Sequence, residues 1–142
     1  MKHGFIKVAA GTPKVRVADP TYNAGELIRI AANANADGVR VLVFPELCLT
    51  AYTCGDLFCT DLLLDGTKKA LSKYLKKTAE FDMISVVGLP WIFSDKLYNC
   101  AAVCHRGRLL GMVPKSVLPN YGEFYELRGF TPAPTDDGKS TF

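Results

Sequence analysis

The chain has 142 residues, of which 49% are hydrophobic and 22% charged, and its formal net charge is +3. A chain of this size and composition can bury a core and is neither a linker nor a disordered tail. Its Lys and Arg residues are scattered, so the charge gives no case for a nucleic-acid partner. No apolar run reaches the ~18 residues of a membrane span, and residues 1–10 lack the core of a signal peptide. We therefore expect a cytoplasmic protein without a membrane partner.

The cysteines form an odd set without a C-x-x-C pair: Cys48, Cys54, Cys59, Cys100 and Cys104. This spacing argues against both a zinc ribbon and a disulfide framework. We predict buried thiols in a reducing compartment and no metal site. Cys59, Cys100 and Cys104 are expected to be packing residues.

The first half of the chain predicts an alternation of strand and helix. A strand is expected at residues 5–10, and residues 22–36 carry apolar side chains at helical spacing before a stop at Gly38. Residues 39–44 form an almost continuous β-branched run, which is typical of a strand covered on both faces. Pro45 ends that strand.

A second helix is predicted over residues 60–80, with its lysines on the solvated side. Its expected apolar side consists of Leu62, Leu63, Ala70, Leu71, Tyr74, Leu75 and Ala79. A buried strand follows at residues 83–90, and two further strands are expected on either side of a turn at residues 105–107. The whole order predicts an α/β fold with a mixed sheet. Residues 131–142 are poor in core residues, so we expect the chain to stop partway through a larger unit.

Two groups of opposite charge follow predicted strands. Glu46 lies two residues beyond one strand and Lys115 directly follows another. Functional groups in open α/β sheets gather beyond the carboxyl ends of strands, so these two side chains could converge. A carboxylate can accept a proton from a nucleophile, and an ammonium can stabilise charge that develops on a carbonyl oxygen. The spacing alone also allows a solvated or purely structural role.

Longer motifs around these two residues add a resemblance. The segments VLVFPELCLTAY at residues 41–52 and RGRLLGMVPKSVLPNYGEFYELRGF at residues 106–130 resemble the nitrilase, or carbon-nitrogen hydrolase, superfamily. TCGDLF at residues 53–58 and the segment from Lys115 onward are more narrowly similar to the amino-terminal glutaminase domains of bacterial glutamine-dependent NAD synthetases. The similarity runs along nearly the whole chain.

This resemblance implies a nitrilase-like αββα sandwich, of which residues 1–142 would form roughly the first half. It implies hydrolysis of glutamine to glutamate and ammonia, and use of the ammonia by a synthetase domain outside this chain to amidate deamido-NAD. No cofactor is expected in this chain, while ATP and Mg²⁺ are expected in the synthetase domain. A homo-oligomer is implied as well.

The resemblance also assigns roles to individual residues. Glu46 falls on the general base, Lys115 on the lysine that stabilises the oxyanion, and Glu123 on a second glutamate that orients the lysine or the substrate. Three aromatic residues fall on positions that help to form the glutamine pocket, although core packing would equally account for them: Tyr52, Tyr121 and Phe124.

Two departures from the family pattern stand out. Ala51 occupies a position where the family usually has glycine, and its Cβ could strain a turn that needs a positive φ. The nucleophilic cysteine of the family lies beyond residue 142, and neither Cys48 nor Cys54 is expected to replace it. We therefore expect the isolated chain to be inactive and to associate through sheet surface meant for the missing half.

Two alternatives remain open at this stage. One is a free-standing amidase or carbamoylase of the same superfamily. The other is a non-catalytic α/β interaction module that keeps the strand-end motifs only as scaffold.

Overall fold

The computed structural model describes residues 4–134, and its elements follow the predicted order. They are β1 (Val8–Ala10), α1 (Pro20–Ala36), β2 (Val41–Val43), the short 3-10 helix η1 (Gly55–Cys59), α2 (Asp61–Lys77), β3 (Ile84–Phe93), β4 (Lys96–His105), β5 (Arg108–Pro114) and the 3-10 helix η2 (Glu126–Arg128). Of the predicted tail at residues 131–142, the last eight residues lie outside the described part.

The strands form one sheet in the order β1-β2-β3-β4-β5. The pairs β1–β2 and β2–β3 are parallel, whereas β3–β4 and β4–β5 are antiparallel, so the predicted mixed sheet is confirmed. The antiparallel strands are joined by two-residue turns, Ser94-Asp95 and Arg106-Gly107, in which every residue has a positive φ. Such turns match the twist of the strands that they connect. The second turn agrees with the prediction, while the first was not predicted.

Helix α1 begins two residues before the predicted start. The side chain of Asp19 accepts a hydrogen bond from the Tyr22 amide at 2.9 Å, and Pro20 occupies the first helical position. Asp is a favourable N-cap and Pro is favourable at the first position, because its missing amide would have had no partner there.

Helix α2 is shorter than predicted and rotated slightly about its axis. Leu62, which was expected on the apolar side, is 87% exposed, whereas Leu64 is buried. The inward-facing residues are Leu63, Leu64, Thr67, Ala70, Leu71 and Tyr74. These positions recur at three- and four-residue spacing, and Leu62 lies outside that phase.

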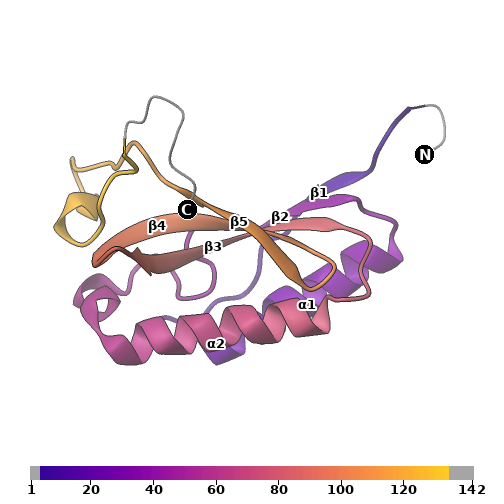
Figure 1. The fold of residues 1–142 in the computed structure, drawn as a ribbon, viewed down its shortest axis with the longest axis horizontal. Coiled ribbons are helices and arrows are strands. Elements are labelled where there is room, and N and C mark those ends of the chain that lie inside the picture. Colours follow the sequence, from indigo (N-terminus) through magenta and orange to yellow (C-terminus); the bar gives the residue numbers. More distant parts are fainter. Residues whose placement is uncertain (1–3, 135–142) are drawn as a thin grey trace.

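Both helices cover the same face of the sheet (Figure 1). Leu27 of α1, Tyr74 of α2 and Leu42 of β2 meet in the core between the layers, each at most 1% exposed. The opposite face carries no α-helix within residues 4–134, and the segment with the short 3-10 helix η2 lies on that side of the sheet, near one of its ends.

The open face of the sheet is apolar. Val8, Val43, Ile84 and Val113 are exposed by 63%, 45%, 38% and 57%. The prediction that the strand around residues 39–44 is covered on both faces is therefore wrong for the described part of the chain, whose second strand spans only Val41–Val43. The prediction of an exposed apolar sheet surface is confirmed. Between residues 4 and 134, no helix is long and apolar enough to cross a membrane.

Candidate functional site

Glu46 and Lys115 meet at one edge of the sheet. β2 and β5 run in the same direction, since β2 is parallel to β3 and β5 is separated from β3 by one antiparallel strand. Both carboxyl ends consequently reach the same edge, where Lys115 Nζ donates a hydrogen bond to Glu46 Oε1 at 2.7 Å. The predicted convergence of the two side chains is confirmed.

The turn that carries Glu46 depends on a glycine in the neighbouring strand. A Cβ on Gly88 would lie 2.5 Å from both the Pro45 carbonyl oxygen and the Leu47 amide nitrogen. The Gly88 carbonyl also accepts a hydrogen bond from the Leu49 amide at 3.2 Å. The absence of a side chain at Gly88 thus allows the turn to pack directly against β3.

A second polar residue holds the same carboxylate. Asn99, which lies in β4 and is 3% exposed, donates a short hydrogen bond from its side-chain amide to Glu46 Oε1. The main-chain oxygen of Asn99 accepts the Lys115 amide at 2.8 Å. Asn99 was not predicted as a site residue, because an asparagine within a strand carries no distinctive signal by itself.

Lys115 is held from its other side by Glu126. Lys115 Nζ donates to Glu126 Oε1 at 2.9 Å, and the Tyr52 hydroxyl donates to the same oxygen at 2.8 Å. The side chain of Glu126 is only 4% exposed. Glu123 was predicted to orient the lysine or the substrate, but the contact to the lysine is made by Glu126. Spacing could not separate two glutamates three residues apart in an irregular segment.

The groups of this cluster shift one another's pKa. Although partial burial alone would lower it, the hydrogen bonds that Lys115 donates to Glu46 and Glu126 raise the pKa of its ammonium above the ordinary value. Desolvation and the hydrogen bond to Glu126 raise the pKa of Tyr52. The cluster therefore presents a protonated lysine between two glutamates, beside a neutral phenol.

The three predicted pocket aromatics lie together. The ring of Phe124 packs edge-on against both Tyr52 and Tyr121, with centroid separations of 6.4 and 5.7 Å. A cavity of about 360 Å³ adjoins this group and is lined by Tyr52, Glu123 and Glu126, but not by Tyr121 or Phe124. A role for these aromatic residues and Glu123 in substrate binding stays a prediction.

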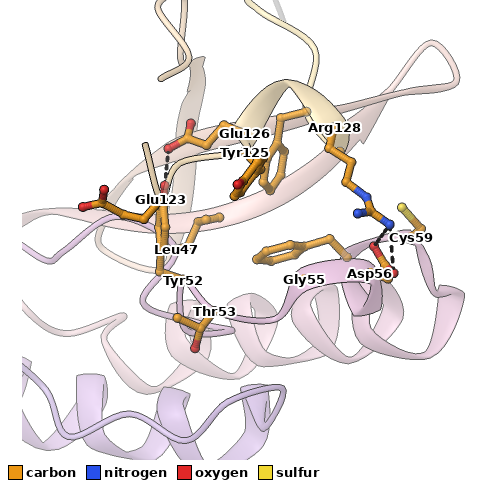
Figure 2. Close-up of a pocket in the computed structure, with 13 residues that line it drawn as sticks. Leu47, Tyr52, Thr53, Gly55, Asp56, Cys59, Glu123, Tyr125, Glu126 and Arg128 are labelled. Atoms are coloured by element: carbon orange, nitrogen blue, oxygen red, sulfur yellow. Dashed lines mark hydrogen bonds and ion pairs between the residues drawn. The ribbon is translucent and has the colours of Figure 1, made fainter. Parts of the chain in front are cut away.

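Figure 2 shows the far end of the cavity, where Arg128 reaches from η2 to Asp56 of η1. These two side chains form an ion pair at 3.1 Å, and both are largely exposed. Cys59 lies at this end and is exposed, so the prediction that it packs in the core is wrong.

The other thiols are poorly suited to nucleophilic attack. Burial raises the pKa of Cys48, Cys100 and Cys104 to about 12, and burial also raises the pKa of Cys54. A thiolate is the reactive form of cysteine, and these surroundings disfavour it.

Ala51 adopts the backbone conformation that the sequence analysis anticipated. Its φ is +68°, in the left-handed region where a Cβ is unfavourable, and its side chain is buried. Ala51 follows the turn that contains Glu46 and directly precedes Tyr52. The backbone strain therefore lies in the segment that holds both of these site residues.

The sequence of this chain is similar to those of known proteins. The carbon-nitrogen hydrolase pattern matches residues 7–136. The chain is 40% identical over 135 residues to the glutamine-dependent NAD(+) synthetase of Mycobacterium leprae, covering 95% of this chain and 20% of that protein. The related protein of Aquifex aeolicus is 36% identical over 114 residues, which are 80% of this chain and 20% of that protein.

Solved structures give the same result at the level of the fold. The crystal structure of a glutamine-dependent NAD(+) synthetase from Cytophaga hutchinsonii matches with a TM-score of 0.86 and 28% identity, covering 92% of this chain and 22% of that one. An amidase from Nesterenkonia sp. matches with a TM-score of 0.78 and 21% identity, covering 94% and 50%. The latter likeness concerns the fold alone.

Proposed function

This chain belongs to the carbon-nitrogen hydrolase family, and from that premise we propose that it forms part of the glutaminase domain of a glutamine-dependent NAD(+) synthetase. The chain spans about a fifth of the length of the curated relatives that it matches, so the remaining parts are inferred from them. The observation that carries the proposal is the contact of 2.7 Å between Lys115 and Glu46 at the carboxyl-end edge of the sheet.

In the proposed reaction, Glu46 accepts the proton of a cysteine thiol supplied by the remainder of the domain. The thiolate attacks the side-chain amide carbon of glutamine, and Lys115 stabilises the negative charge on the amide oxygen in the transition state. The C–N bond then breaks and ammonia leaves with the proton that Glu46 held. Water hydrolyses the resulting thioester to glutamate and restores the thiol.

The ammonia would serve a synthetase domain of the same polypeptide, which amidates deamido-NAD at the expense of ATP with Mg²⁺. This chain would contribute the base and the lysine, and glutamine would be its substrate. A cytoplasmic location and a homo-oligomer belong to the same proposal.

A free-standing amidase is less well supported. The relatives that are at least 36% identical over 80% or more of this chain carry the name of NAD synthetases, whereas the amidase structures are only 21% to 22% identical. The polar cluster argues against a non-catalytic module. A lysine held between two glutamates at the carboxyl-end edge of a sheet is typical of a functional site, and a purely structural role does not require it.

The test uses the complete natural polypeptide that carries this sequence. We expect it to release glutamate from glutamine and, with ATP, Mg²⁺ and deamido-NAD present, to form NAD in equal amount. Added ammonia should replace glutamine in the second reaction. Hydrolysis of small aliphatic amides without any NAD formation would contradict the proposal and favour the amidase alternative.

A further inference from the structure

The side chain of Asn99 is a buried polar group in the middle of an apolar strand. It lies in β4 between Tyr98 and Cys100, all three of them buried. Neighbouring residues of a strand point to opposite faces, so Cys100 packs toward the helices while Asn99 points away from them. A buried amide in such a place requires hydrogen-bond partners, and Glu46 supplies one.

The partners of Glu46 are distributed unequally between its two oxygens. Oε1 accepts hydrogen bonds from both Asn99 Nδ2 and Lys115 Nζ. Within residues 4–134, no hydrogen bond is made to Oε2. A carboxylate oxygen that already accepts two donors is a poor proton acceptor, whereas the other oxygen keeps its lone pairs available.

We propose that Asn99 is a positioning residue for Glu46, which fixes Oε1 and leaves Oε2 as the atom that accepts the proton of the nucleophile. Two donors, one in β4 and one directly after β5, hold one oxygen, and the carboxylate can then no longer rotate to exchange its oxygens. The inference rests on the proposed function, since it concerns the base of the same reaction.

The two contacts of Asn99 can be separated by mutation. Its main-chain oxygen, which accepts the Lys115 amide at 2.8 Å, is present in any residue at this position. Both Asn99→Leu and Asn99→Asp therefore keep the backbone contact to Lys115 and remove the amide donor to Glu46, and Asn99→Asp in addition places a second carboxyl group beside that of Glu46. Asn99→Asp keeps the shape of the side chain where leucine would disturb packing.

In the complete polypeptide, we expect either substitution to lower kcat for glutamine hydrolysis by about 10- to 100-fold, with KM changed by less than about threefold. NAD formation from added ammonia should stay within about twofold of wild type. The matched control is Cys100→Ala, which disturbs the same strand on its other face and should lower stability without this loss of kcat. In a Glu46→Gln background, Asn99→Leu should have no further effect, because the positioned base is already absent.

A crystal structure of the Asn99→Leu or Asn99→Asp variant provides a readout that needs no activity. We expect the Glu46 carboxylate to rotate or to occupy more than one position. Unchanged kcat together with an unchanged Glu46 position would overturn the proposal, as would an additive loss in the Glu46→Gln background. A wild-type polypeptide that does not hydrolyse glutamine would contradict the proposed function instead, and the position of Glu46 in the variant would still decide the role of Asn99.

Discussion

Each edge of the sheet carries a cluster of three charged side chains, but the two clusters have opposite charge patterns and different surroundings. At the carboxyl-end edge, one ammonium, that of Lys115, lies between the carboxylates of Glu46 and Glu126. At the opposite edge, the single carboxylate of Asp82 lies between the guanidinium groups of Arg40 and Arg106. The side chain of Glu126 is 4% exposed, whereas that of Asp82 is 52% exposed.

The Asp82 cluster is a solvated group of ion pairs, whereas the Lys115 cluster is a partly buried polar site. Hydrogen bonds from Arg106 and Arg40 lower the pKa of Asp82, but exposed pairs of this kind are screened by salt and contribute little to stability. The cluster around Lys115 adds neutral donors, the amide of Asn99 and the phenol of Tyr52, each directed at a carboxylate. Charge alone therefore does not identify the functional edge; burial and the number of directed donors do.

The largest effect on stability is expected at the backbone that supports Glu46. Gly88→Ala would place a Cβ 2.5 Å from two main-chain atoms, so the turn at residues 45–47 must shift. We expect a loss of about 2 kcal/mol or more in the free energy of unfolding, measured by denaturant titration. Gly111→Ala is the matched control, because nothing lies within 4 Å of a Cβ there. Equal stability of the two variants would contradict the close packing of the turn.

Neutralising one carboxylate at each edge should show the next largest effect. Glu126→Gln removes a buried charge and leaves an amide group where Glu126 Oε2 already has no partner, so we expect a loss of about 1 to 3 kcal/mol. Asp82→Asn should leave stability unchanged within error, because its ion pairs are exposed. Comparable losses in the two variants would remove the distinction between the edges.

The smallest effect concerns the strained residue beside Tyr52. Ala51→Gly relieves the cost of a Cβ at φ +68° but increases the entropy of the unfolded chain, so we expect a net gain of up to about 1 kcal/mol. Gly55→Ala, at φ +54°, should have the opposite sign. Thermal unfolding of both variants tests this, and a destabilised Ala51→Gly variant would argue against strain at this position.

Much of this architecture could be predicted from local patterns. Two strands were predicted from the apolar run that ends at Pro45 and from the glycine of the turn at residues 105–107. Because the carboxyl ends of both strands were expected at the same edge of the sheet, Glu46 and Lys115 could be predicted to converge there. The start of α1 was misplaced although Asp19 and Pro20 form a local helix-start signal. Leu62 was misplaced because one residue of helical phase depends on tertiary packing.

The rest of the site depends on segments without a repeating pattern. Glu126 reaches Lys115 only through the course of residues 116–125, which form no strand and no helix. Asn99 meets Glu46 because β4 pairs with β3 in one particular register, with Asn99 opposite Pro90. Neither an irregular loop nor a strand register can be derived from the spacing of charges in the sequence.

In the proposed reaction, Glu46 is the proton-accepting base of glutamine hydrolysis. The most direct measurement compares glutamine-driven and ammonia-driven NAD formation in the complete polypeptide carrying Glu46→Gln, with Asp82→Asn as the control. Glutamine at position 46 has nearly the same size as glutamate but cannot accept the thiol proton, so glutamine-driven turnover should fall by about 100-fold or more. Ammonia-driven synthesis should remain within about twofold of wild type, and the control should retain both. An equal loss of both reactions in a folded Glu46→Gln protein, or undiminished turnover with glutamine, would contradict this role for Glu46.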